Sequence, residues 1–445
     1  MKKSLAILGL TLAPVWAQGP LSLREAVRTA LAKNKSIEAA NAGAKAAETR
    51  IEQAKSGYLP KVNYAETFAR SDNPVFVFSS LLTQHRFGME NFAIGPLNRP
   101  DAMNNFQSQL TVDQVVYDAG QTRHAMHSAD LARQLTGEES RRAEMDVIAG
   151  VIRAYYGTVL AAESLKTAQE ALRSAEADLK RADSVRQAGM STDVDVLSIR
   201  VHRAGVEEQR IRCAADLDVA RAALNEVMGL PLDTPHDLNT SLVPLDIPEI
   251  DLPDYERKAV DNRPETRETN LAASLARVQA DSAKASLLPQ VGVRAGFEAD
   301  RRRLWSGGGT NWLAAVSLKW NLFNGFADKA RIAEAGYALN RAEAERERAS
   351  SGARLQVRRA WADLRAAQQR IEVARAAMAE SAESLRITQN RYAAGLANVT
   401  DLLRNETAVL ESRTRYLAAV HDQRISATMV QLAAGILGPD AEVLN

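Results

Sequence analysis

The sequence has little cysteine, few aromatic residues and no excess of charge of either sign. Its single cysteine, Cys213, excludes an internal disulfide framework and any multi-cysteine metal site. Lys and Arg number 56 and Asp and Glu number 55, so the net charge is +1. A nucleic-acid-binding protein normally carries a clear basic excess, so this class is not expected. Aromatic residues make up only 5% of the 445 residues. Long stretches rich in alanine, glutamate, arginine and leucine predict a mainly helical protein.

Long uncharged apolar runs are also missing after the N-terminus, so we expect no membrane-spanning helix, which needs about 20 apolar residues. At the N-terminus, Lys2 and Lys3 precede a short apolar run that ends in Val15-Trp16-Ala17. This pattern predicts a signal peptide at 1–17, cleaved before Gln18. The residue directly after the expected cleavage site is Gln18 and not a cysteine. We therefore expect export through the inner membrane and no lipoprotein anchor.

Signatures of catalysis are lacking as well. No set of residues in the sequence combines a nucleophile, a base and an acid, so we expect neither an enzyme nor a bound cofactor. His124 and His127 are three residues apart, but no third ligand follows nearby, and we expect no metal site. Gly307-Gly308-Gly309 lacks the Lys-Ser/Thr partner of a phosphate-binding loop. It is predicted to be an exposed loop between strands.

The sequence contains two similar halves, which is the mark of an internal repeat. Leu59-Pro60-Lys61-Val62 recurs 229 residues later as Leu288-Pro289-Gln290-Val291. Further along, Gly189 recurs as Gly395, an offset of 206. The smaller offset places extra chain at 71–104, which contains several prolines and is predicted to be a long loop.

Prolines also mark the boundary between the halves, because repeated prolines interrupt helices and central strands. We expect a signal peptide at 1–17, a first structural repeat at 18–230, a proline-rich connector at 231–253 and a second structural repeat at 254–445.

Each half contains two segments in which apolar and polar residues alternate. An alternation with a period of two is the pattern of a strand with one polar face. Strands are predicted at about 59–70, 105–117, 289–300 and 311–323. In the second half, one apolar stripe runs from Trp312 to Leu322. A soluble sheet with one wet face and a membrane β-barrel both fit this pattern.

Very long helices follow the strands. Small and apolar residues recur at alternating steps of three and four from Leu364 to Gly395, and in the same register from Leu165 to Ala182. This heptad spacing predicts a left-handed coiled seam. We expect single helices at 121–187 and 327–393, each on the order of 100 Å long.

Each long helix is expected to begin a helical hairpin. Gly189 and Gly395 predict where the long helices end. The hairpins are expected at about 121–229 and 327–437, with tips at 188–195 and 394–401. Four strands per chain are too few to close a membrane barrel, which needs about eight, so membrane strands would require several copies of the chain.

The ordered set of motifs resembles the TolC family of outer-membrane efflux proteins. It includes Leu288-Pro289-Gln290-Val291 before a strand, Leu322-Phe323-Asn324-Gly325 after one, and Tyr392 to Gly395 with Asp401 to Leu403 at a tip. The resemblance implies a mainly α fold with a small β part. In that fold, hairpins form a trimeric α-barrel, and four strands per protomer contribute to a 12-stranded transmembrane β-barrel.

The implied function is that of an outer-membrane exit duct in a tripartite efflux system, through which substrates pass passively. The implied partners are two further copies in a homotrimer, a periplasmic adaptor protein, an inner-membrane transporter of the RND, ABC or MFS type, and outer-membrane lipid. The implied location is the outer membrane, with a long periplasmic extension. Type I protein secretion and metal-ion efflux are alternatives, and a structural coiled-coil envelope protein without a channel is a further one.

The resemblance also assigns roles at the tips. Asp195 and Asp401 match aspartates that narrow the periplasmic entrance, and Tyr392 matches a tyrosine that latches neighbouring tips. As alternatives, the helix dipole favours an acid near a helix N-terminus, and Tyr392 could be an ordinary seam residue. Ala397 stands where the family often has an arginine, and Arg404 stands where it can have a second acid. Both departures weaken the expectation of a latch between neighbouring tips and of a ring of acidic residues at the entrance.

The same resemblance implies that the adaptor docks on Val185–Leu197 and Tyr392–Leu403. The residues expected to carry this contact are Gly189, Leu197, Gly395 and Leu403. The alternative is that these segments are only turns.

Overall fold

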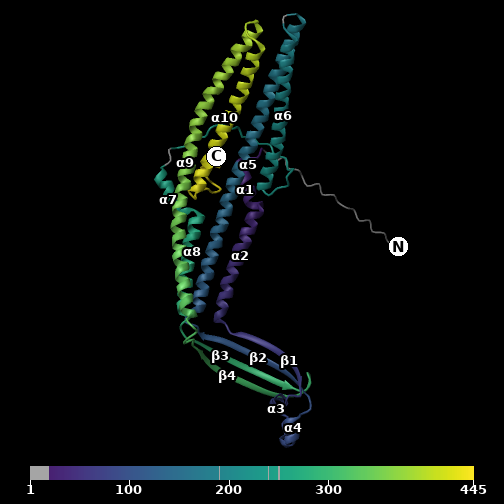
Figure 1. Ribbon diagram of the computed structural model, residues 1–445, viewed down its shortest axis with the longest axis vertical. Coiled ribbons are helices and arrows are strands. Elements are labelled where there is room, and N and C mark those ends of the chain that lie inside the picture. Colours follow the sequence, from purple (N-terminus) through teal and green to yellow (C-terminus); the bar gives the residue numbers. More distant parts are fainter. Residues whose placement is uncertain (1–19, 190, 239, 249–250, 445) are drawn as a thin grey trace, which may run out of the picture. The chain divides into compact units, whose positions relative to one another are not determined.

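The computed structural model describes residues 20–189, 191–238, 240–248 and 251–444, and Figure 1 shows their helices and strands. The expected signal peptide at 1–17 lies outside the described residues. The chain divides into two compact units, and each takes segments from both halves of the sequence. The helical unit comprises the described parts of Met1–Ala40, Ser140–Thr266 and Ser350–Asn445, and the sheet unit comprises Asn41–Glu139 and Arg267–Ala349.

The helices form two series that repeat along the chain. The first series is α1 (Leu23–Lys33), α2 (Lys35–Lys55), α5 (Gln121–Gln187) and α6 (Asp193–Val227). The second series is α7 (Leu252–Asn262), α8 (Pro264–Ala285), α9 (Ala327–Ala393) and α10 (Val399–Ala433). The single helices expected at 121–187 and 327–393 are confirmed at both ends. 3-10 turns also form in the described chain, among them η1 (Ser56–Tyr58) and η3 (Glu442–Leu444).

Each long helix forms an antiparallel hairpin with the helix that follows it (Figure 1). In the first hairpin, the Thr158 hydroxyl on α5 donates to the Ala220 carbonyl on α6 at 3.1 Å. In the second, the hydroxyls of Ser381 on α9 and Ser412 on α10 lie 2.7 Å apart. Small hydroxyl-bearing residues permit such close approach. The small residues that recur at heptad spacing in the sequence thus lie at the packing surface within each hairpin.

The centre of the helical unit is built largely by α5. Val151, Ile152 and Tyr155 are fully buried, in one cluster with Val357 of α9 and Val420 of α10. One 18-residue window of α5 is apolar enough to cross a membrane by length and composition alone. More than half of that window is buried within the protein. This is typical of a core helix.

Two glycines form equivalent joints in the two halves. Gly229 follows α6 with φ +70°, and Gly435 follows α10 with φ +71°. A Cβ at Gly229 would lie 2.5 Å from the Lys33 carbonyl oxygen, between α1 and α2. A Cβ at Gly435 would lie 2.7 Å from the Arg263 nitrogen, between α7 and α8. Only glycine fits both the left-handed backbone and the close approach, so each hairpin ends against the same kind of helix junction.

The connector between the halves lies along α10. No helix or strand forms at 231–238 and 240–248. The Gln423 side chain accepts from the Leu245 N–H at 2.9 Å and donates to its carbonyl at 3.0 Å. Arg424 donates to the Val243 carbonyl at 2.9 Å. Side chains of α10 therefore satisfy backbone groups that have no partner in regular structure.

The sheet unit contains an antiparallel sheet in the order β1-β2-β3-β4 (Figure 1). Its strands are β1 (Lys61–Ser71), β2 (Met103–Tyr117), β3 (Gln290–Arg301) and β4 (Gly309–Lys319). The register aligns one apolar row across all four strands, namely Tyr64, Leu110, Phe297 and Trp312. The alternation predicted from the sequence is thereby confirmed.

The two faces of this sheet differ in polarity. Each member of the apolar row is exposed, and Trp312 is 81% exposed. On the opposite face, Asp113 and Arg294 form an ion pair at 2.5 Å across β2 and β3. The apolar stripe expected to reach Leu322 is shorter, because β4 ends at Lys319. Beyond it, the Trp320 indole N–H donates to the Leu287 carbonyl at 3.0 Å.

The segment at 71–104 was expected to be a loop without helix, and this was wrong. It forms α3 (Pro74–Thr83), η2 (Met89–Phe92) and α4 (Ile94–Asn98). The Asn73 side chain accepts from the N–H groups of Val75 and Phe76 at 3.0 and 3.2 Å. Pro74 occupies the first turn, where its missing N–H is not needed. Pro74, one of the prolines on which the loop prediction rested, instead starts the helix.

Candidate functional site

The two hairpin tips end their long helices in the same way. Gly189 and Gly395 have φ of +75° and +72°. Their N–H groups donate to the carbonyls of Arg186 and Tyr392 at 2.8 and 3.0 Å. No described atom lies within 4 Å of a Cβ built on either glycine. The glycines are therefore needed for the backbone turn, and both are exposed.

The helices that leave the tips also begin in the same way. Thr192 precedes α6 and its hydroxyl accepts from the Asp195 N–H at 3.2 Å. Asn398 precedes α10 and its side chain accepts from the Asp401 N–H at 2.8 Å. Both are standard N-caps. The two aspartates predicted for the entrance thus occupy equivalent positions in the first turn of each helix.

The two aspartate carboxylates have different surroundings. The Asp195 carboxylate accepts from the Thr192 hydroxyl at 2.8 Å, from the Thr192 N–H at 3.1 Å and from the Ser191 hydroxyl at 3.1 Å. The Thr192 bonds, together with that from Ser191, lower the pKa of Asp195 below its ordinary value. Asp401 is exposed, and within the described chain its carboxylate makes no hydrogen bond. Asp195 therefore completes a capping box, whereas Asp401 leaves its charge in solvent.

The hairpins meet beneath the tips in a small apolar cluster, which we name the tip contact. Its buried members come from α5, α6 and α10, namely Ala182, Val196, Ile199 and Val399. Leu179, Tyr392 and Leu403 pack against it. Residues from both hairpins thus form one contact within a single chain.

The tip contact contains one residue predicted for gating, Tyr392, and one predicted for docking, Leu403. Burial, followed by the charges of Asp195 and Asp178, raises the pKa of Tyr392, so this tyrosine lies within electrostatic reach of Asp195. Of the predicted docking residues, Leu197 is 56% exposed, but Leu403 packs into the tip contact. Equal sequence register therefore does not give the two leucines equal exposure.

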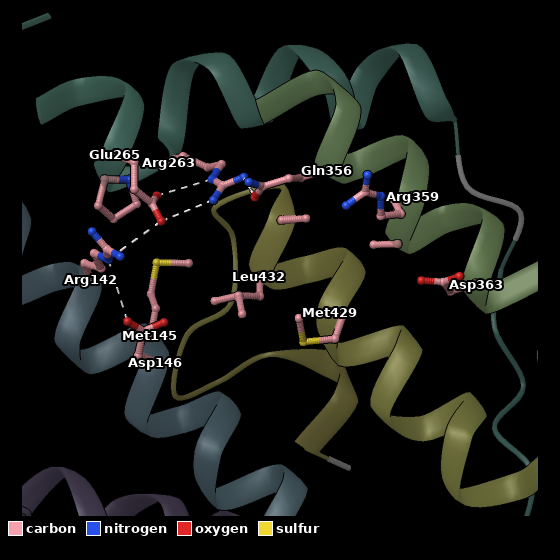
Figure 2. A pocket seen from close by; sticks show the side chains of 13 residues that line it. Arg142, Met145, Asp146, Arg263, Glu265, Gln356, Arg359, Asp363, Met429 and Leu432 are labelled. Atoms are coloured by element: carbon pink, nitrogen blue, oxygen red, sulfur yellow. Dashed lines mark hydrogen bonds and ion pairs between the residues drawn. The ribbon is translucent and has the colours of Figure 1, made fainter. Parts of the chain in front are cut away.

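A cavity of about 410 Å³ lies where α5, α8, α9 and α10 meet in the helical unit (Figure 2). Glu265 bridges two arginines, 3.2 Å from Arg263 and 3.8 Å from Arg142. Arg263 also donates to Gln356 of α9 at 2.5 Å. Burial disfavours the Glu265 carboxylate, but the hydrogen bonds from Arg263 and the backbone outweigh it and lower the pKa of Glu265. The charges of these arginines are neutralised by carboxylates, so the arrangement fits a contact that holds the helices together.

Residues examined for chemistry in the sequence are not brought together. Cys213 is buried in α6. Among the described residues, no three His, Cys, Asp or Glu side chains are placed to hold a metal ion. The features shared by the two halves are instead the paired tips, the contact beneath them and the open sheet.

A profile of the family described as outer membrane efflux protein matches residues 26–230 and 257–435. The chain belongs to this family. The two matches fall one in each half, as the internal repeat requires. Membership also establishes the general function, an outer-membrane channel for efflux or secretion, and the outer membrane as its location.

Known relatives and solved structures are similar to this outer membrane efflux protein over much of its length. Protein CyaE of Bordetella pertussis is 29% identical over 349 residues, which cover 76% of this chain and 72% of CyaE. The probable outer membrane lipoprotein SilC of Salmonella typhimurium is 24% identical, with 46% of each chain covered. The CmeC outer membrane channel of Campylobacter jejuni has a TM-score of 0.79 and 16% identity, covering 99% of this chain and 96% of that one. The TolC-like fold is therefore shown.

One pair of residues in this efflux protein was missed in the sequence. Asp178 of α5 and Glu406 of α10 are both buried and lie close enough for each carboxyl group to shift the pKa of the other. A signal was present, because Asp178 lies three residues after Ala175 and four before Ala182, on the small-residue face that α5 buries. A carboxyl group at such a position needs a polar partner, but the partner comes from the other half of the chain and was not predictable from local sequence.

Proposed function

We propose that this protein is the exit duct of a tripartite efflux system, and that three copies join into one channel. The family match carries the proposal, because its description specifies efflux. The sheet supports the trimer: β1 and β4 are its two edges, and its apolar face is exposed. Unpaired strand edges in lipid cost several kcal/mol per group. Three copies pair all the edges and give twelve strands.

The partners in this proposal are a periplasmic adaptor and an inner-membrane transporter that supplies the energy. The adaptor docks on the tips through Gly189, Leu197, Gly395 and Leu403. The exposed glycine turns and the exposed Leu197 support this assignment. Leu403 acts differently in the proposal, because it shapes the tip from within the tip contact.

The gate in this proposal is formed by Asp195, Asp401 and Tyr392 at the periplasmic entrance. Three copies of the exposed Asp401 would place a ring of negative charge around the pore. Tyr392 holds the second hairpin against the first through the tip contact. A passive duct needs a bore and a gate but no catalytic residue, so we propose that the protein is not an enzyme. We also propose that it is exported by means of a cleaved signal peptide.

Cross-linking of the tips tests the trimer and the gate together. In a Cys213→Ala background, Leu197→Cys and Leu396→Cys place one exposed thiol on each tip, and a cleavable bifunctional reagent joins neighbouring copies. We expect cross-linked trimers that no longer export substrate, and full recovery after cleavage of the reagent. The matched controls are the two single-cysteine variants treated in the same way. Continued export by fully cross-linked trimers would exclude the tips as the gate.

A further inference from the structure

Two buried carboxyl groups, Asp178 and Glu406, lie side by side between the two helical hairpins, and we name them the buried pair. Asp178 on α5 is 2% exposed and Glu406 on α10 is 8% exposed. Glu406 accepts a hydrogen bond from Ser174, one helical turn before Asp178 on α5, so the two carboxyl groups lie close together and each shifts the pKa of the other. Two ionised carboxylates offer only acceptors, so a hydrogen bond between them requires one proton.

The hydrogen bonds made by the carboxyl oxygens of the buried pair indicate which oxygens are left for this proton. The Ser174 hydroxyl on α5 donates to Oε1 of Glu406 at 3.1 Å. Oδ2 of Asp178 and Oε2 of Glu406 are both buried, and neither accepts a well-oriented hydrogen bond from the described residues. Nε2 of His202 lies 3.0 Å from Oε2 of Glu406, and a proton held by the buried pair satisfies Oδ2 of Asp178. Without it, two like charges would face each other away from water.

Every helix around Asp178 contributes a charged or titratable group. Arg181 on α5 lies 3.4 Å from Asp178. Nε2 of His202 on α6 lies 3.0 Å from Oε2 of Glu406 on α10. Tyr392 of α9 is within electrostatic reach of Asp178. The buried pair is therefore part of a network that spans both hairpins.

Burial raises the pKa of Asp178 to about 7, and the hydrogen bond to Glu406 and the charge of Glu406 act in the same direction. The charges of Arg181 and His202 act in the opposite direction and are outweighed. The proton of the buried pair is therefore exchanged near neutral pH. A cavity of about 240 Å³ adjoins Glu406 and His202 and gives water a route to them.

The buried pair also lies next to the tip contact. Asp178 is one helical turn from Ala182, the α5 member of that contact, and on the same face. Asp178 and Glu406 belong to different hairpins, so repulsion between them acts directly on the distance between the hairpins. A change in the charge of the buried pair is therefore transmitted to the tips through packed neighbours.

We propose that Asp178 and Glu406 form a proton-dependent lock between the hairpins of each copy, which holds the tips together while the pair shares a proton. Loss of that proton separates the hairpins and favours the open channel. The lock rests on the proposed function, because it acts on the gate at the tips. Asp178 and Glu406 are positioning residues, since neither lies at a tip.

The direction of the pH effect follows from the two states of the hairpins. When the hairpins separate, water reaches Asp178 and its pKa returns toward the ordinary value of 3.8. When they are packed, the pKa is about 7. The lock is therefore at full strength below about pH 4, weakens as the pH rises from there, and has lost this contribution above about pH 7.

Conductance of the purified full-length channel in planar bilayers between pH 5 and pH 8 tests the lock. We expect the open probability of the wild type to rise with pH, by up to about tenfold per pH unit for each copy that opens, until it levels off above pH 7. Asp178→Asn keeps a hydrogen bond to Glu406 without a second charge, so its open probability should stay low at every pH. Glu176→Gln, which changes an exposed carboxylate on α5, is the matched control and should behave as the wild type.

A second variant keeps the test decisive if Asp178→Asn does not fold. Glu406→Gln removes the hydrogen bond and the repulsion that raise the pKa of Asp178, so the pH midpoint should move to lower values. A wild-type channel with no pH dependence, or an Asp178→Asn channel with the wild-type dependence, would overturn the lock and leave the duct function intact. A wild-type protein that conducts at no pH would contradict the proposed function itself.

Discussion

Single side chains at the tips perform tasks that their position alone does not reveal. Asp195 and Asp401 occupy equivalent sites in the two halves, yet only Asp195 accepts three hydrogen bonds from the turn before its helix. Its carboxylate holds the start of α6, whereas Asp401 leaves that task to Asn398. The two halves of the repeat therefore share the backbone position of this aspartate but differ in the hydrogen bonds that its carboxylate makes.

Asp195→Ala should loosen the first turn of α6. Loss of the capping bonds costs about 1 kcal/mol, so amide hydrogen exchange there should become about fivefold faster. Asp193→Ala is the matched control, since Asp193 is in the same turn but pairs only with exposed Arg186 at 3.1 Å. Equal acceleration in both variants would contradict the capping role.

The pH dependence of this protection has a definite sign. Because the folded pKa of Asp195 is lowered, its contribution to stability is present above the ordinary pKa of aspartate and is lost as the pH falls through the lowered value. The first turn of α6 should therefore exchange faster in acid in the wild type, after correction for the intrinsic rate. Asp195→Ala should not show this change.

At the scale of elements, the sequence predicted what depends on local pattern. The heptad steps from Leu364 to Gly395 predicted α9, because helix periodicity is a property of neighbouring residues. The same reasoning missed α3, because the prolines at 71–104 were counted as evidence for a loop although proline is favoured in the first turn of a helix. It also missed the burial of Asp178, which is decided by a helix from the other half of the chain. The periodicity of neighbouring residues does not indicate which distant residues come into contact.

The four left-handed glycines after α5, α6, α9 and α10 allow a matched test of element packing. Gly229→Ala and Gly435→Ala add both a strained backbone, which costs about 1–2 kcal/mol, and a clash with backbone atoms at 2.5 and 2.7 Å. Gly189→Ala and Gly395→Ala add only the strain, because no described atom lies within 4 Å of the new Cβ. The first two variants should therefore lower the midpoint of thermal unfolding at least twice as far. Four equal midpoints would show that the joints tolerate a side chain.

At the scale of the whole molecule, one chain supplies only part of a closed wall. The four-stranded sheet has two edges, and its apolar row from Tyr64 to Trp312 is exposed in a single copy. The apolar row suits a lipid environment, but the unpaired backbone groups of the two edges are unstable in lipid until another copy pairs with them. Joining of copies is therefore a physical requirement of this sheet in a membrane, and the tips, the tip contact and the buried pair then regulate one shared bore.

The most direct measurement is ion current across a planar lipid bilayer after addition of the purified protein, with the number of chains in the inserted particle determined by native mass spectrometry. The account predicts stepwise currents from particles of three chains. A single-chain particle that leaves the bilayer sealed would contradict it.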